Sequence, residues 1–178
     1  MGEFLETTFE KFIFKVKVGY LYSQEEFWAN FQNGAATVGL TDFMQKAKGD
    51  VAFLETVAPG AGIKRGQEIG KIETIKATFG IISPVSGKIA EVNPEMDASP
   101  YLINHDPYGA GWIYRIELSD PEDDKAQLME AKEYFELMRD KVAQEAKKLY
   151  GYEIQESGGA PLQRHRQGLR RPGPGNRL

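Results

Sequence analysis

The sequence predicts a mainly β fold, a small sandwich or flattened barrel with a short internal helix and a long C-terminal amphipathic helix. Many short segments rich in β-branched and aromatic residues are separated by turn signals such as Asn33-Gly34. The order of these segments shows no β-α-β pattern of the kind that builds a parallel sheet. A stripe of apolar residues at spacings of three and four follows Pro121 and predicts the C-terminal helix.

The first predicted strand covers residues 11–18, where apolar residues alternate with lysines. The lysines on its outer face discourage edge-to-edge association with other chains. This strand could pair with the sheet of the main domain or with a partner protein. Its apolar face is predicted to comprise Phe12, Phe14, Val16 and Val18.

Asn33-Gly34 predicts a tight hairpin that joins strands at 28–31 and 37–40. A short helix over 43–48 should follow, capped at its start by Thr41 or Asp42, because their side chains can accept a free backbone N–H. Gly49 suits the end of this helix. The next strand is predicted at 50–57.

Lys76 lies between two apolar segments, so it is predicted at the tip of a hairpin. Ile72 and Ile75 favour an extended chain before it, and Ile81-Ile82 resume the strand after it. Further strands are predicted at 88–92 and 112–118, with a loop between them at 96–108. A lysine at such a tip is solvent-reachable and well placed for covalent attachment.

A single C-terminal helix is predicted from Pro121 to about Tyr150, with Asp120 as its N-cap and acids in its first turn. Its first half is expected to cover the sheet of the domain. Its second half could do the same, or bind a partner or a second copy. The predicted apolar stripe consists of Leu128, Ala131, Phe135, Met138, Val142 and Leu149.

These elements divide the chain into four predicted parts. They are an N-terminal strand extension at 1–19, a main domain at 20–120, the C-terminal helix at 121–152 and a disordered tail at 153–178 rich in Gly, Pro and Arg. The tail carries five arginines after Ser157 and no acid. It is expected to be solvated, although it could dock an acidic partner.

Composition excludes several functional classes. The chain has 178 residues and a net charge of −4 although its tail is basic, so the remainder is acidic and unsuited to nucleic acid. It has no cysteine and two histidines, which excludes disulfides, thiolate metal sites and cysteine nucleophiles, and no metal site is predicted. No segment approaches the roughly 20 apolar residues of a membrane span, and the N-terminus lacks a signal-peptide layout. The cytoplasm is the expected location.

Several blocks resemble the glycine cleavage system H protein family. Glu73-Thr74-Ile75-Lys76-Ala77, followed by Ser83-Pro84-Val85-Ser86-Gly87, is similar to the lipoylation hairpin of that family. Residues 37–43, 49–55 and 104–112 resemble further family blocks in the same order. The resemblance runs from about Tyr22 to about Asp120.

The resemblance implies a lipoyl/biotinyl-type hybrid barrel-sandwich in which Lys76 carries lipoic acid in amide linkage. It also implies that Glu73 and Gly87 serve recognition by the lipoylating enzyme, a lipoate ligase or an octanoyltransferase. Glu73 could equally be an ordinary solvated acid on a strand. No catalytic motif is present, so the chain is expected to be a non-catalytic carrier whose chemistry belongs to its cofactor.

The family's reaction cycle implies three partner enzymes. Glycine decarboxylase would load an aminomethyl group on the lipoyl arm, aminomethyltransferase would remove its carbon, and dihydrolipoyl dehydrogenase would reoxidise the arm. One departure concerns these partners: Glu26-Phe27 stands where the family has His-Glu. This change leaves open whether the surface near the lipoyl arm serves the same partners as in other members of the family.

Three alternatives remain open from the sequence. The chain could be an H-like lipoate-binding protein that carries sulfur intermediates in a heterodisulfide-reductase-like sulfur oxidation system. A biotin carrier is disfavoured, because Lys76 lies between Ile75 and Ala77 and not between methionines. An unmodified interaction module of the same fold predicts no mass change at Lys76.

Overall fold

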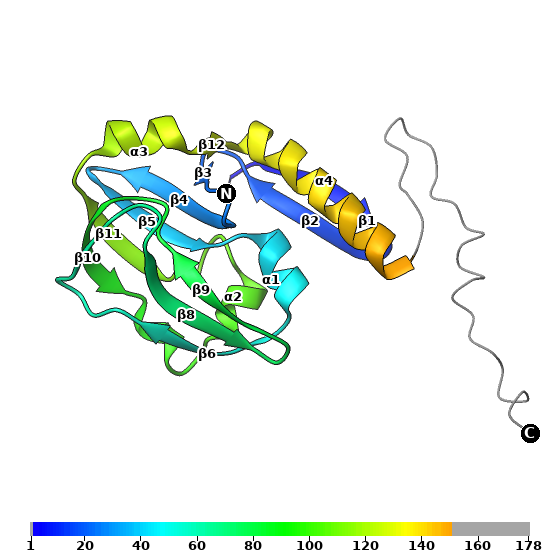
Figure 1. Cartoon of the computed structure of the whole chain (residues 1–178), viewed down its shortest axis with the longest axis horizontal. Helices are drawn as coiled ribbons and strands as arrows, with labels where there is room; N and C mark the ends of the chain where they lie inside the picture. Colours follow the sequence, from blue (N-terminus) through cyan, green and yellow to red (C-terminus); the bar gives the residue numbers. More distant parts are fainter. Residues whose placement is uncertain (1, 151–178) are drawn as a thin grey trace, which may run out of the picture.

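The computed structural model describes residues 2–150, and their side chains up to residue 145. Two sheets face each other and form a sandwich, and a two-stranded hairpin with a long helix is attached to one side (Figure 1). This arrangement confirms the predicted mainly β fold with a short internal helix and a long C-terminal helix. No helix among the described residues is long and apolar enough to cross a membrane.

The larger sheet has seven strands in the order β12-β3-β4-β5-β11-β10-β7, and the smaller has the order β6-β8-β9. Their facing sides share one apolar core, in which Ile69, Ile72, Ile81 and Ile89 are almost completely buried. The strands of the larger sheet are β3 (Leu21–Tyr22), β4 (Phe27–Gln32), β5 (Ala35–Leu40), β7 (Gly62–Ile63), β10 (Gly87–Val92), β11 (Tyr114–Leu118) and β12 (Met129–Glu130). Those of the smaller sheet are β6 (Val51–Thr56), β8 (Glu68–Thr74) and β9 (Thr78–Ile82).

Local turn and cap chemistry places the elements around the first hairpin. Asn33 and Gly34 both adopt positive φ, 51° and 79°, which matches the tight turn predicted between β4 and β5. Thr41 caps α1 (Asp42–Lys48) by accepting the Met44 N–H at 3.2 Å. Gly49, with φ of 90°, ends that helix as predicted.

The predicted loop at 96–108 contains regular structure. It includes α2 (Leu102–His105), and a 3-10 turn at Pro94–Met96 precedes it. Ile103 of α2 is fully buried in the sandwich core. The helix is only one turn long, so its apolar pattern was too short to be recognised in the sequence.

The prediction of one continuous helix after Asp120 is wrong. The chain forms α3 (Pro121–Gln127), then Leu128 becomes extended, and after β12 the chain forms α4 (Ala131–Tyr150). β12 pairs with β3, with Met129 opposite Tyr22. The hydrogen bonds between β12 and β3 replace the helical hydrogen bonds that a continuous helix would form there. The spacing of apolar residues does not indicate this interruption of the helix.

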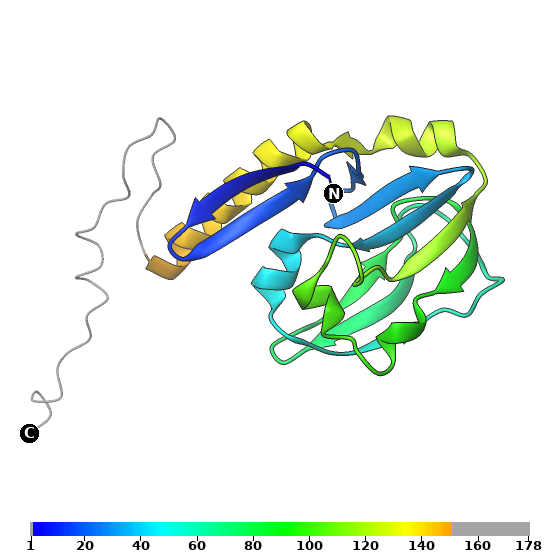
Figure 2. The ribbon, with the colours of Figure 1, turned by 180° about the vertical axis from the view of Figure 1, so that it is seen from behind.

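The N-terminal segment forms its own hairpin of β1 (Phe4–Phe9) and β2 (Phe12–Lys17), which joins neither sheet of the sandwich. The prediction had only the second of these strands. Figure 2 shows the hairpin lying along α4. Phe12 and Val18 are 45% and 36% exposed and not buried as predicted, since Phe12 follows the turn and Val18 lies beyond the end of β2.

A second apolar cluster fills the space between this hairpin, α4 and the sandwich. Phe14 and Val16 of β2 meet Tyr134, Met138 and Val142 of α4 there. The second half of the helical stripe therefore packs on the chain's own N-terminal hairpin as far as Val142. Leu149 and the tail from 151 lie outside the residues whose side chains are described.

Glu26 holds the attached helix to the sandwich through a buried carboxylate. This side chain is 1% exposed, and one of its oxygens accepts hydrogen bonds from the hydroxyls of Thr41, at 2.8 Å, and Tyr134. Its other oxygen pairs with the Lys141 ammonium. Burial, and then the nearby Glu26 charge, raise the pKa of Tyr134 well above its usual value, so the phenol stays a neutral donor.

Both Glu26 and Phe27 are buried, so neither side chain contributes directly to an exposed partner surface. The glutamate instead serves an internal contact with α4. Tyr134 and Lys141 lie more than 100 positions further along the chain, so no local sequence pattern indicates this contact.

We predict that Glu26→Ala lowers the free energy of unfolding by about 3 kcal/mol, because it leaves two buried hydroxyls and one ammonium without their acceptor. Denaturant unfolding measures this change. The matched control is Glu25→Ala, an exposed neighbour, which should change stability by less than about 0.5 kcal/mol. Equal stability of the two variants would contradict the structural role of the carboxylate.

Candidate functional site

Lys76 lies at the tip of the β8–β9 hairpin, where the sequence predicted it. β8 ends at Thr74, β9 begins at Thr78, and Ile75 and Lys76 are both exposed between them. In Figure 1 the tip lies at the lower edge of the sandwich. Ile75 was predicted within the strand, and it belongs to the tip instead.

The Thr74 side chain shapes this tip. Its hydroxyl oxygen accepts the N–H groups of Ala77 at 3.0 Å and Lys76 at 3.3 Å, and its O–H donates to the Ala77 carbonyl at 3.2 Å. Neither Ile75 nor Lys76 has a positive φ, so this is not one of the primed turns that usually close two-residue hairpins. The buried hydroxyl supplies the acceptor that holds the tip in one shape.

The tip is also tied to the segment below it. Ile75 donates its N–H to the Asp50 carbonyl at 3.2 Å. Asn104 of α2 fastens both neighbours of Asp50, since it accepts the Val51 N–H at 2.9 Å and donates to the Gly49 carbonyl at 3.1 Å. Asn104 is thus a supporting residue that the sequence analysis did not single out. Its position in the 104–112 block was the only available signal.

The aliphatic part of the Lys76 side chain lies over the end of α1. A Cβ added at Gly49 would stand 3.6 Å from Lys76 Cδ, which is ordinary van der Waals contact. Among the described residues, no hydrogen bond or ion pair engages the Lys76 ammonium. The arrangement presents one primary amine to solvent on a fixed base, which suits acylation by another protein.

Glu73 and Gly87, the two other predicted site residues, occupy different places. Glu73 is exposed on the outer face of β8, one residue before Thr74, where the strand that leads to Ile75 and Lys76 ends. Gly87 begins β10 in the other sheet, opposite Leu118. A Cβ there would stand 1.9 Å from the Glu117 carbonyl oxygen, so close strand approach requires glycine. The structure thus brings Glu73 close to the tip and gives Gly87 a role in the sheet.

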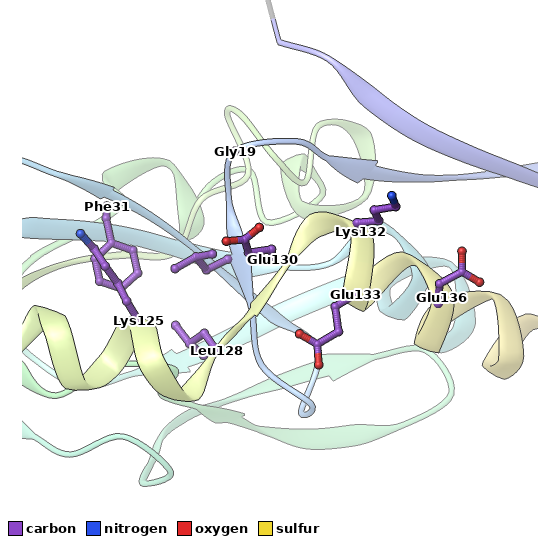
Figure 3. A pocket seen from close by; sticks show the side chains of 9 residues that line it. Gly19, Phe31, Lys125, Leu128, Glu130, Lys132, Glu133 and Glu136 are labelled. Atoms are coloured by element: carbon purple, nitrogen blue, oxygen red, sulfur yellow. The ribbon is translucent and has the colours of Figure 1, made fainter.

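A groove lies elsewhere, between the sandwich and the start of α4 (Figure 3). It has a volume of about 850 Å³ and opens widely to solvent. In Figures 1 and 2, β3 and β12, which contribute to it, lie on the opposite side of the sandwich from the β8–β9 tip. Its lining includes Leu21, Phe31, Leu128, Glu130 and Glu133, a mixture that shows no catalytic arrangement.

We predict that Thr74→Val loosens the tip, because valine keeps the shape of threonine and removes the acceptor. The amide hydrogens of Lys76 and Ala77 should exchange faster, and stability should fall by about 1 kcal/mol. Hydrogen exchange read by NMR tests this expectation. Thr74→Ser retains the hydroxyl and should behave like the parent protein, so the same loosening in both variants would contradict it.

We predict that Gly87→Ala destabilises the protein by about 3 kcal/mol, since the added methyl collides with backbone of β11. Thermal or denaturant unfolding measures this loss. Gly62→Ala in the adjacent β7 is the matched control, because a Cβ there meets nothing within 4 Å. If both variants are equally stable, a steric role for Gly87 is excluded.

Comparison with known proteins places these features in a family context. The family model described as "Glycine cleavage H-protein" matches residues 20–141, which leaves the β1–β2 hairpin before the match. A "Probable glycine cleavage system H protein" of Pyrococcus abyssi is 40% identical over 127 residues, 71% of this chain and 94% of that protein. One with the same description from Aeropyrum pernix is 37% identical over 78% of this chain and 96% of its own length. The crystal structure of a glycine cleavage system H protein from Mycobacterium marinum is 30% identical, covers 65% of this chain and 93% of its own, and superposes with a TM-score of 0.59.

Proposed function

Because the chain belongs to the glycine cleavage H-protein family, whose members are non-catalytic carrier subunits, we propose that it carries lipoic acid on Lys76 and serves the enzymes of the glycine cleavage system. One observation carries the assignment of the site. Lys76 is an exposed amine at the tip of a hairpin whose shape is held by Thr74 and Asp50. A modifying enzyme would therefore meet the lysine in one geometry.

The residues around Lys76 fit a covalently attached lipoyl group. The side chain is exposed, its ammonium has no partner among the described residues, and no cysteine exists in the chain to form a mixed disulfide with a dithiolane. When attached, the group would supply a pair of sulfurs that undergo oxidation and reduction, one of which would carry the aminomethyl group. The chain itself supplies a rigid attachment point and a tether.

Attachment requires the neutral Lys76 amine as nucleophile. Its nitrogen would attack the carbonyl carbon of an activated lipoyl or octanoyl group, the N–C bond would form, and the bond to the activating group would break. The amine proton would pass to a base of the enzyme. In this proposal Glu73 is a recognition contact close to the tip, and Gly87 contributes by keeping the strands of the larger sheet in place.

The proposed partners follow from the family. They are glycine decarboxylase, aminomethyltransferase and dihydrolipoyl dehydrogenase, together with a lipoate ligase or octanoyltransferase, and the cytoplasm remains the expected location. The relatives described above are named as glycine cleavage system H proteins, and nothing in the structure favours the alternative role in sulfur oxidation. We therefore retain the glycine cleavage assignment.

We predict that incubation with lipoate ligase, lipoate and ATP adds one lipoyl group to the protein and none to Lys76→Arg, as read by intact mass. Arginine keeps the charge at the tip and cannot be acylated by this chemistry. Lys71→Arg, a change in the same hairpin, is the matched control and should be modified normally. A folded parent protein that gains no mass would overturn the carrier assignment.

A further inference from the structure

The two outer edges of the N-terminal hairpin have different surroundings. β2 lies on the side of the sandwich, and β1 lies on the side away from it (Figure 2). The outer edge of β2 is covered, because the Lys15 N–H donates to the Asp42 carboxylate at 2.8 Å and the Tyr108 hydroxyl donates to the Lys15 carbonyl at 2.7 Å. The outer edge of β1 (Phe4–Phe9), which we call the open edge, has no such cover among the described residues.

The alternation of the strands shows which backbone groups of the open edge face outward. Val18 donates its N–H to the Glu3 carbonyl at 2.9 Å, so Glu3 and every second residue after it bond to β2. The residues between them point their N–H and C=O groups away from β2. Glu6 and Thr8 are two of these, and no hydrogen bond from any described residue engages their outward backbone groups. The open edge therefore offers donors and acceptors to another strand.

β1 lacks the features that usually protect such an edge. Proteins commonly block an open edge with a lysine, a proline or a β-bulge. β1 contains neither lysine nor proline, Glu6 is its only charged residue, and its register with β2 is continuous. The lysines Lys15 and Lys17 belong to β2, whose edge is already covered. These observations favour pairing of β1 with a further strand.

A second copy of β1 is self-complementary to this edge in one register. Antiparallel pairing about a two-fold axis keeps α4 of both copies on the same face of the sheet, so opposed residues must share a face. Two registers then give the longest overlap of β1 with itself. One sets Glu6 opposite Glu6 of the second copy, and opposed like charges are destabilising. The other sets Thr7 opposite Thr7, Glu6 opposite Thr8 and Leu5 opposite Phe9, with no opposed like charges.

The attached helices are compatible with this register. α4 contacts both strands of its hairpin, so it lies over the pair. The centre lines of two joined hairpins are two strand spacings apart, about 9.6 Å, and packed helices lie roughly 8–10 Å apart. Leu5 and Phe135 line an open groove of about 760 Å³ beside α4. Phe9 of the second copy, opposite Leu5 on the face that carries α4, would cover part of that groove.

We propose that two copies of this chain pair through β1 and form a two-fold dimer with one four-stranded sheet in the order β2-β1-β1-β2. Because the other edge of β2 is covered, pairing stops at two copies. The family match begins at residue 20, so the interface belongs to the segment that precedes the matched region. Neither β8 nor β9 contributes to it, and each dimer presents two exposed Lys76 side chains.

A single introduced cysteine tests the register, because the chain has no cysteine of its own. Thr7→Cys places two thiols across a non-hydrogen-bonded pair with Cα atoms roughly 4.5 Å apart, within the range of a disulfide. Mild oxidation of the full chain should convert most of this variant to a covalent dimer on a non-reducing gel. Lys11→Cys, exposed at the hairpin turn, is the matched control. Its two copies would lie roughly 25 Å apart in the dimer, so cross-linking should be at least about tenfold slower.

Light scattering over a range of concentrations measures the mass in solution. The parent chain should have twice the mass of one chain, and Thr8→Pro should be a monomer, because proline removes an outward N–H without removing a bond to β2. Unfolding curves check that Thr8→Pro is folded, and the cysteine test stands without this variant.

A monomeric parent chain would overturn the proposal, and a monomer whose Thr8 amide resists hydrogen exchange would assign the open edge to another part of the same chain. A dimer that persists in folded Thr8→Pro, or equal cross-linking of the two cysteine variants, would also overturn it, by placing the contact between copies elsewhere. None of these measurements involves Lys76, so their outcome is independent of the proposed function.

Discussion

The buried Glu26 carboxylate is the interaction on which the arrangement of the two parts of the molecule depends. It binds Thr41, which caps α1, and it binds Tyr134 and Lys141 of α4. The far end of α1 at Gly49 lies beside the aliphatic part of the Lys76 side chain, and the next residue, Asp50, accepts a hydrogen bond from the backbone of the tip. A charge inside the protein thus connects the attached helix with the base of the candidate site.

The N-terminal hairpin and the long C-terminal helix cover each other's apolar faces. Each has an apolar face that the sandwich leaves partly uncovered, and the two faces meet in a cluster around Val16 and Met138. The family match begins at residue 20, so the hairpin is an addition to the matched region. The hairpin buries Phe14 and Val16 against α4, whereas Phe12 and Val18 stay exposed.

The candidate site differs from the rest of the fold, because it exposes a large apolar side chain, Ile75, beside its charged ones. Thr74, Asp50 and Asn104 fix the backbone beneath the tip, while Lys76, Ile75 and Glu73 face solvent. A carrier needs this division, because its lysine must be accessible to several enzymes and yet be presented in one geometry. The rigidity of the tip comes from buried hydrogen bonds, and the exposed face leaves the proposed attachment lysine accessible.

The sequence by itself determined the features that depend on near neighbours. The alternating strands, the Asn33-Gly34 turn, the Thr41 cap and Lys76 at a hairpin tip all follow from interactions within a few residues. Only the tertiary structure decided the features that depend on distant contacts. The break between α3 and α4 arises because β12 bonds to β3, Glu26 is buried because α4 covers it, and Asn104 acts on a segment 53 positions earlier. Local chemistry determines which segments form strands and turns, but burial and pairing between distant segments determine which residues face solvent.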